Sequence, residues 1–200
     1  MTAAKHIVIA VCSGDMVHAD FAMSLAMVLL VTDQARVPVD ISNVRTSIIP
    51  HSRTMAVEEA KAAGATHVLF LDSDMTFPGN AALRLLAHDK PIVGATYRQR
   101  SPPHILNHRE LDGAFGEVSA DEVDLRPVES IGTGCLLIEM QVFTKIPIPY
   151  FRFGYEKGKP QMVGEDTLFC RDAREAGYKI WMDPGLSRDI EHIGLGKFKV

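Results

Sequence analysis

Cysteine is scarce in this sequence, and its three copies lie far apart. Cys12, Cys135 and Cys170 form no CxxC pair, and their number is odd. A zinc site built on paired cysteines and a disulfide framework both need closer or matched spacing. The pattern therefore argues against both and favours a reducing compartment.

Long hydrophobic runs are also missing. The most apolar stretch, residues 21–31, covers 11 residues, whereas a membrane-spanning helix needs about 20. The opening run, residues 7–11, is too short for the core of a signal peptide and leads into no small-residue cleavage site. We therefore expect a cytoplasmic protein with no membrane span.

An excess of positive charge is absent as well, since the formal net charge is −4. General nucleic-acid binders carry a basic surface, so we expect no nucleic-acid partner. An anionic substrate would need a locally positive site, made by a few side chains, helix N-termini or a bound metal. The 200 residues, 46% hydrophobic and 23% charged, suit one globular domain.

The first half of the chain alternates strand-like and helix-like segments. Strands are expected over residues 6–11, 37–42, 67–71 and 91–95, and helices over residues 19–32, 53–63 and 78–86. Ser52 can cap the second of these helices, and Gly64 supplies its C-terminal stop. This alternation predicts a mainly parallel α/β sheet with helices on both faces. Residues 97–130 are polar and turn-rich, which predicts a smaller antiparallel part in the C-terminal half. Strands over residues 135–138 and 178–182 flank a helix over residues 165–176.

The strongest chemical signal is a buried strand that ends in two aspartates, Asp72 and Asp74, on either side of Ser73. In extended backbone, residues i and i+2 point the same way, so the two carboxylates can converge on one ion. Ligands bind at the carboxyl ends of central strands in open α/β sheets. Carboxylate oxygens suit Mg²⁺ or Mn²⁺, which complete their shells with substrate phosphates. The alternative is that the aspartates only cap the following turn.

Two further signals are weaker. Glu165 and Asp166 open a helix, where the macrodipole favours acids, so a structural role explains them equally well. His192 follows the last strand. A lone histidine is more often structural than a ligand, yet one imidazole beside two carboxylates suits Mn²⁺.

Taken in order, these segments resemble the GT-A-fold glycosyltransferases, particularly the large family-two group of nucleotide-diphospho-sugar transferases. The resembling segments are residues 51–53 with their helix, 72–74, 131–135 and 164–178, and His192. The resemblance implies one GT-A (Rossmann-like) domain over residues 1–200. It also implies a nucleotide-binding half over about residues 1–100 and an acceptor and catalytic half over about residues 101–200.

The resemblance implies a metal-dependent transfer of sugar from a UDP- or GDP-sugar to a hydroxyl acceptor on a glycan, lipid or protein. It assigns Mn²⁺ or Mg²⁺ to Asp74, with His192 completing the metal site. Asp72 would face the nucleotide ribose or a water on the metal. Asp166 matches the acid that deprotonates the acceptor hydroxyl in inverting members, and Glu165 is the second candidate. Retaining members share the fold without needing this base, so both stereochemical outcomes stay open.

Nucleotide-sugar contacts are implied along several segments of the chain. They are Val11, Cys12, Ser13, Arg53, Asp72, Ser73, Gly132 and Gly134. The structural alternatives are an exposed helix arginine at position 53 and tight backbone packing at the two glycines. Many relatives carry a proline in the first-strand loop, which this chain lacks over residues 11–15. Because the sequence ends soon after His192, we expect a minimal enzyme or one module of a larger assembly.

Three rival functions are weighed against this one. A haloacid-dehalogenase-type phosphatase uses an Asp-x-Asp-x-Thr nucleophile motif, which residues 72–76 match literally. That motif usually stands on the first strand, whereas two strand-helix units precede it here. A nucleotidyltransferase needs a glycine- and arginine-rich first loop, in which this chain has only Gly14. A non-catalytic nucleotide-sugar binding module would have no reason to retain all the candidate acids and the histidine.

Overall fold

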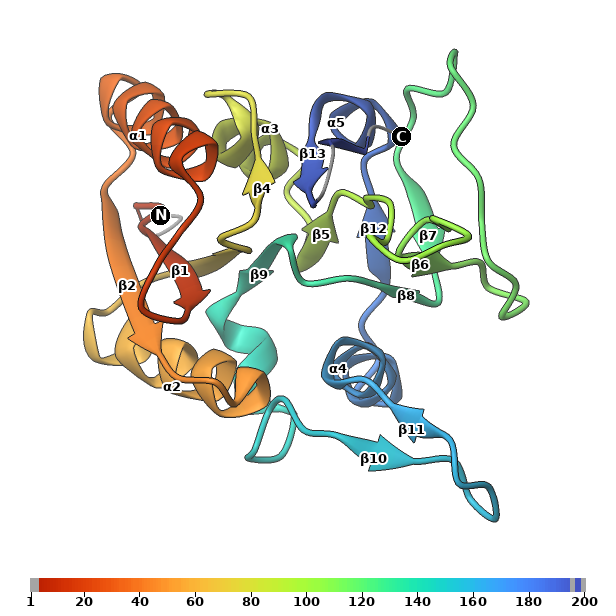
Figure 1. Cartoon of the computed structure of the whole chain (residues 1–200). Helices are drawn as coiled ribbons and strands as arrows, with labels where there is room; N and C mark the ends of the chain where they lie inside the picture. The colour runs from red at the N-terminus through yellow and green to blue at the C-terminus, as the bar shows by residue number, and fades with distance from the viewer. Residues whose placement is uncertain (1–3, 195–196, 199–200) are drawn as a thin grey trace.

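A seven-stranded mixed sheet forms the centre of the computed structural model, which describes residues 4–194 and 197–198 (Figure 1). Its strands are β1 (Ile7–Ser13), β2 (Val39–Arg45), β3 (His67–Leu71), β5 (Ile92–Gly94), β7 (Arg126–Val128), β9 (Cys135–Glu139) and β12 (Ile180–Met182). They lie in the order β2-β1-β3-β9-β5-β12-β7. Only β9 and β7 run against the other five strands. The expected mainly parallel α/β sheet is confirmed.

Helices cover both faces of this sheet, as the sequence predicts. They are α1 (Ala19–Gln34), α2 (Ile49–Ala62), α3 (Ala81–Ala87), α4 (Glu165–Glu175) and α5 (Pro184–Asp189). Side chains alternate along β1, so that Val8 packs on the face covered by α2 and α4, and Ile9 on the face covered by α1, α3 and α5. Within the described residues, no helix is long and apolar enough to cross a membrane.

Three small antiparallel sheets complete the fold. β4 (Met75–Thr76) pairs with β13 (Glu191–Ile193), which pairs with β14 (Lys197–Phe198). β6 (His108–Arg109) pairs with β8 (Ser130–Ile131), and β10 (Gly154–Tyr155) pairs with β11 (Met162–Val163). A short 3₁₀ helix, η1 (Met140–Thr144), follows β9. The expected smaller antiparallel part in the C-terminal half is therefore present.

The start of α2 differs from the sequence-based expectation. The helix begins at Ile49, four residues before the expected start, with Pro50 in its first turn, where its fixed φ suits a helix start. Ser52 does not cap the helix, because it lies inside it and its hydroxyl donates a hydrogen bond to the carbonyl oxygen of Val44 at 2.8 Å. The expected stop is confirmed, since Gly64 has φ +69° directly after the helix.

Candidate active site

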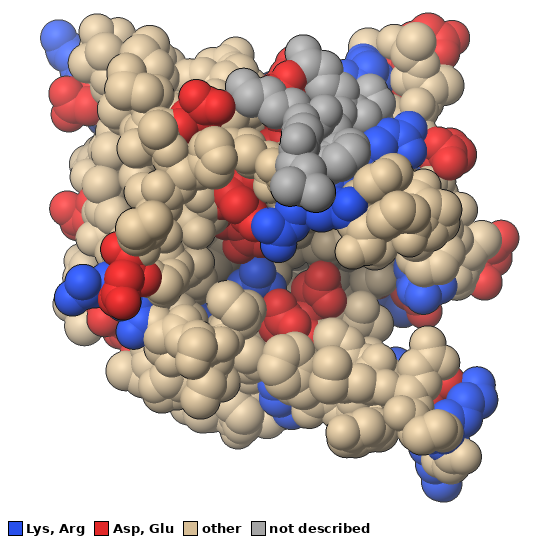
Figure 2. Space-filling view, viewed as in Figure 1, with Lys and Arg blue, Asp and Glu red and all other residues tan. Residues whose placement is uncertain are grey.

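A cleft of about 490 Å³ opens at the carboxyl ends of β1 and β3. It is called the central cleft below. The face of the molecule in Figure 2 is hollowed at its centre, where acidic and basic side chains gather. Eight residues expected from the sequence line the cleft: Cys12, Ser13, Arg53, Asp72, Ser73, Asp74, Glu165 and His192. The structure therefore brings together side chains from both halves of the chain.

Asp74 and His192 meet because β4 pairs with β13. Met75 is the register partner of His192, and the backbone N–H of Ile193 donates to the carbonyl oxygen of Asp74 at 2.7 Å. The imidazole Nε2 then lies 3.6 Å from Asp74 Oδ2. The other ring nitrogen, Nδ1, lies 2.8 Å from the carbonyl oxygen of Arg98. This second contact orients the ring as outer partners orient metal-binding histidines.

The contact between Asp74 and His192 shifts the pKa of both residues. Burial alone would raise the pKa of Asp74, but the hydrogen bond and charge of His192, together with Arg100, hold it below its usual value. Burial alone would lower the pKa of His192, but Asp74 and the Arg98 carbonyl raise it above its usual value. A negative carboxylate is therefore favoured at position 74.

Arg100 is a cleft residue that the sequence analysis did not identify. Its Nη1 lies 3.0 Å from Asp74 Oδ2, and its side chain is 54% exposed. It follows β5 in the sequence much as Asp74 follows β3, and both strands run in the same direction. The position of a polar segment directly after an apolar strand was the signal that could have identified it.

Arg53 is buried, and its guanidinium is held by two carboxylates. Nη2 lies 3.0 Å from Asp72 Oδ1, and Nη1 lies 2.6 Å from Glu165 Oε1 and also contacts Thr133 Oγ1. Burial would lower the pKa of Arg53, but Asp72 and Glu165 raise it, so the side chain stays charged. The alternative of an exposed helix arginine is wrong, since the side chain is 6% exposed. Its position is fixed by contacts distant in sequence.

Asp72 and Glu165 are the two acids that pair with Arg53. Asp72 lines the same cleft as Asp74 but directs its carboxylate to Arg53. Within residues 4–194 and 197–198, no group of three His, Cys, Asp or Glu side chains is placed to hold a metal ion. Asp74 and His192 bring two side chains of metal-ligating type together in the cleft.

Asp166 stands in the first turn of α4, on the wall of an adjoining cleft of about 350 Å³. Its Oδ1 accepts a hydrogen bond from the backbone N–H of Thr167 at 2.7 Å. Burial, and then the negative charge of Glu165, raise the pKa of Asp166, although Arg53 opposes this. Of the two acids, Asp166 has the raised pKa that suits a proton acceptor, whereas the carboxylate of Glu165 is bound to Arg53.

Three of the expected nucleotide-sugar contacts lie outside the central cleft. The side chain of Val11 is 1% exposed and packs in the core beside α1. A Cβ added to Gly134 would lie 2.6 Å from Met75 Sδ, and one added to Gly132 would lie 2.6 Å from the Tyr97 hydroxyl. Close packing against these two side chains therefore explains both glycines.

No protein-family model and no curated protein matches this chain. A solved structure of A197 from STIV is similar, with a TM-score of 0.63 and 14% identity over 94% of this chain and 86% of that one. A mutant of Drosophila β-1,4-galactosyltransferase 7, in complex with manganese, UDP-Gal and xylobiose, gives a TM-score of 0.55. Its identity is 12% over 94% of this chain and 71% of that one. At these identities the similarity shows a shared fold alone.

Proposed function

We propose that this chain, whose fold is that of the GT-A glycosyltransferases, is a metal-dependent glycosyltransferase. In this proposal it moves a sugar from a UDP- or GDP-sugar to a hydroxyl acceptor. The observation that carries it is the Asp74–His192 pair in the central cleft, with the Asp166 carboxylate in the adjoining cleft. A cation site beside a separate proton acceptor is what transfer from a sugar diphosphate requires.

The residues of the central cleft fit a divalent ion. Asp74 and His192 would hold Mn²⁺ or Mg²⁺, and the imidazole favours Mn²⁺ of the two. When bound, the ion supplies positive charge that stabilises the leaving diphosphate. Asp72 remains with Arg53 in this proposal and faces the nucleotide ribose, as a hydrogen-bond acceptor rather than a metal ligand.

Arg100 adds an exposed positive charge to the same place. Its guanidinium lies 3.0 Å from Asp74 Oδ2, the carboxylate oxygen that also faces His192. A divalent ion bound there would compete with Arg100 for this oxygen. The exposed side chain is then free to donate to the donor diphosphate, for which guanidinium geometry is well suited.

Asp166 acts as the base in the proposed reaction. It takes the proton of the acceptor hydroxyl while the acceptor oxygen forms a bond to the sugar C1. The bond from C1 to the diphosphate oxygen breaks, and its electron pair leaves with the nucleotide diphosphate. The raised pKa of Asp166 brings the base closer to neutral pH, where proton transfer is most effective. This assignment implies inversion at C1.

Glu165 has a positioning role in this scheme. Its carboxylate neutralises the buried Arg53, which in turn holds Asp72. We also propose one domain with a nucleotide-binding half over about residues 1–100 and an acceptor half over about residues 101–200, acting in the cytoplasm. The central cleft lies between these halves, since Asp72 comes from the first and Glu165 from the second.

The test is release of nucleotide diphosphate from UDP- and GDP-sugars in Mn²⁺, measured with a panel of glycan, lipid and peptide acceptors. We expect turnover with one nucleotide class, and loss of turnover in Asp166→Asn but not in Asp33→Asn. Asp33 is an exposed acid at the end of α1 and serves as the matched control. Hydrolysis of p-nitrophenyl phosphate in Mg²⁺, without any release from sugar nucleotides, would overturn the proposal in favour of a phosphatase.

A further inference from the structure

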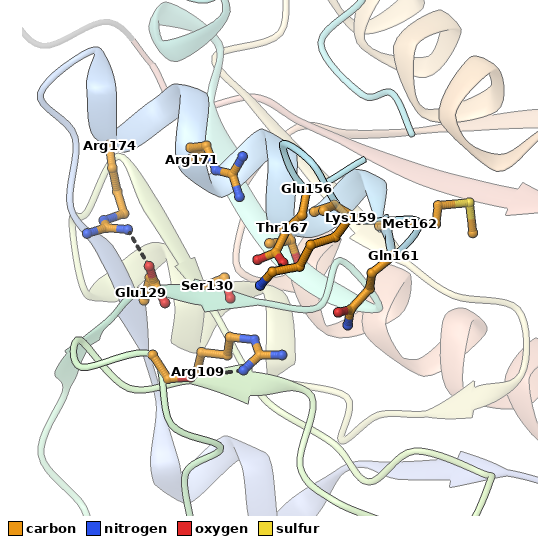
Figure 3. Close-up of a pocket in the computed structure, with 13 residues that line it drawn as sticks. Arg109, Glu129, Ser130, Glu156, Lys159, Gln161, Met162, Thr167, Arg171 and Arg174 are labelled. Carbon is orange, nitrogen blue, oxygen red and sulfur yellow. Dashed lines mark hydrogen bonds and ion pairs between the residues drawn. The ribbon is translucent and has the colours of Figure 1, made fainter. Parts of the chain in front are cut away.

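A second cleft, of about 540 Å³, lies beyond Asp166 and is rich in basic side chains (Figure 3). It is called the basic cleft below. Its charged lining consists of four cationic and two anionic residues: Arg109, Lys159, Arg171, Arg174, Glu129 and Glu156. The whole chain has a formal net charge of −4, so this positive excess is local. A local excess of this kind attracts anions from solution.

The cationic side chains come from three separate elements and face a shared space. Figure 3 shows Arg171 and Arg174 projecting from α4, Arg109 from the opposite wall, and Lys159 from the turn between β10 and β11. Lys159 Nζ pairs with Glu156 Oε2 at 2.8 Å. Arg174 Nη1 pairs with Glu129 Oε1 at 3.2 Å. Each of the two carboxylates in the lining of the basic cleft thus forms an ion pair with one cation.

No ion pair within 4 Å is found for Arg109 or Arg171 among the described residues, although both interact at longer range with the charge of Glu156. Arg109 donates to the carbonyl oxygen of Gly113 at 2.9 Å and lies 4.1 Å from the centroid of the Phe115 ring. The Arg171 side chain is exposed and forms no hydrogen bond or ion pair with a described residue. Two guanidinium groups are therefore available to a ligand, and guanidinium binds phosphate and carboxylate through paired hydrogen bonds.

The basic cleft is continuous with the proposed reaction centre. It shares Arg109 and Thr167 with the adjoining cleft that contains Asp166. That cleft shares Asn107 and Glu165 with the central cleft. A molecule in the basic cleft can therefore reach Asp166 from the side opposite to the donor site.

We infer that the basic cleft binds an anionic group of the acceptor, a phosphate or a carboxylate on the molecule whose hydroxyl is glycosylated. This inference rests on the proposed glycosyl transfer for its link to an acceptor, but anion binding itself does not. Arg109 and Arg171 make the paired contacts to the anion, and Lys159 adds charge from the hairpin. The anionic group thus fixes the position of the acceptor hydroxyl beside Asp166.

The test is calorimetric titration of glucose 6-phosphate, glucuronate and glucose into the wild type, Arg171→Glu and Lys179→Glu. Lys179 is exposed and lies outside the basic cleft, so its variant carries the same charge change as a matched control. We expect at least one anionic sugar to bind more tightly than glucose. Loss of the charge-assisted bonds of Arg171 weakens that binding by about tenfold, and Lys179→Glu leaves it unchanged.

Equal binding of glucose and both anionic sugars would overturn the inference, and so would anion binding that Arg171→Glu does not weaken. UDP and GDP with Mn²⁺ are titrated into the same samples. Nucleotide binding without an Arg171-dependent anion site contradicts only the acceptor inference. An Arg171-dependent anion site in a protein that binds neither nucleotide contradicts the proposed function and removes the link to an acceptor.

Discussion

Asp74 Oδ2 and His192 Nε2 lie 3.6 Å apart, although the two residues belong to different halves of the chain. The short antiparallel pairing of β4 with β13 sets this distance. The carbonyl oxygen of Arg98 holds the other ring nitrogen, so the imidazole presents Nε2 to the carboxylate. The small sheet therefore holds these two side chains together without a ligand, and such preorganisation would lower the cost of ordering them on binding.

Asp74→Asn tests the metal site. The amide keeps the shape of the side chain but removes the charge that attracts the ion. Changes around metal ligands typically weaken metal binding by about 10–100-fold, and we expect a direct ligand to reach at least the upper figure. The measurement is Mn²⁺-dependent nucleotide affinity by calorimetry, with Asp33→Asn as the control. Unchanged affinity in Asp74→Asn would remove this residue from the metal site.

Asp166→Asn tests the base. We expect donor binding to persist while turnover falls by about 10²–10⁴-fold, the usual contribution of general base catalysis. Because burial raises the pKa of Asp166, the wild-type rate should fall with acidification at a pH above the ordinary aspartate value of about 3.9. The measurement is the pH profile of kcat. A retained rate with the same acid limb in Asp166→Asn would show that Asp166 is only a helix-end residue.

Arg53→Met tests the buried guanidinium. The substitution keeps an unbranched side chain but leaves Asp72 and Glu165 without the cation that neutralises them. Breaking a buried ion pair by removing one partner typically costs about 3–5 kcal/mol. The measurement is the free energy of unfolding from urea titration, with the exposed Arg171→Met as control. A loss below about 1 kcal/mol would place Arg53 among ordinary surface residues.

Asp183→Asn tests the buried carboxylate of the residue that caps the N-terminus of α5. Asp183 is 1% exposed and accepts hydrogen bonds from Arg84 Nε at 2.6 Å and from the Leu186 N–H at 2.8 Å. Burial would raise its pKa, but these bonds and that of His88 lower it. The carboxylate therefore stabilises the fold above the unfolded pKa of about 3.9, and this stabilisation is lost as pH falls through the lowered folded pKa.

We expect Asp183→Asn to cost about 3 kcal/mol of unfolding free energy at pH 7, the lower end for a broken buried ion pair. The difference from the wild type should begin to shrink as the pH falls below the unfolded pKa of about 3.9 and continue to shrink toward the lowered folded pKa. The measurement is urea unfolding of both proteins from pH 7 to pH 3. A difference that stays constant across this range would mean that the charge of Asp183 contributes nothing.

Local pattern was sufficient to predict much of the fold. Apolar runs predicted six of the seven strands of the central sheet and the helices α1 to α4, whereas β7 and α5 were not expected individually. The end of β3 at Leu71 was predictable for the same reason, because the apolar strand changes abruptly to the acid Asp72. The start of α2 was misplaced because Ser52, which looks like a cap, bonds to β2 instead. That contact involves a distant strand and has no signature in the local sequence.

The candidate site was harder to predict than the fold, because it is formed by contacts between residues that lie far apart in the sequence. Asp72, Asp74 and His192 line one cleft, as the sequence led us to expect. The sequence did not show that Asp72 would contact Arg53 while Asp74 contacts His192. Arg53 pairs with both Asp72 and Glu165, so the Asp72 carboxylate is directed to Arg53, whereas Asp74 faces His192. The basic cleft was not foreseen either, because Arg109 and Arg171 look like surface charges until β6 and α4 face each other.

Calorimetric titration of UDP and GDP into the wild-type protein, first with Mn²⁺ and then with EDTA, tests the central claim most directly. The account predicts micromolar binding of one nucleotide that disappears in EDTA and in Asp74→Asn. Binding of neither nucleotide in Mn²⁺, or binding that EDTA leaves unchanged, would contradict a metal-dependent nucleotide-sugar site formed by Asp74 and His192.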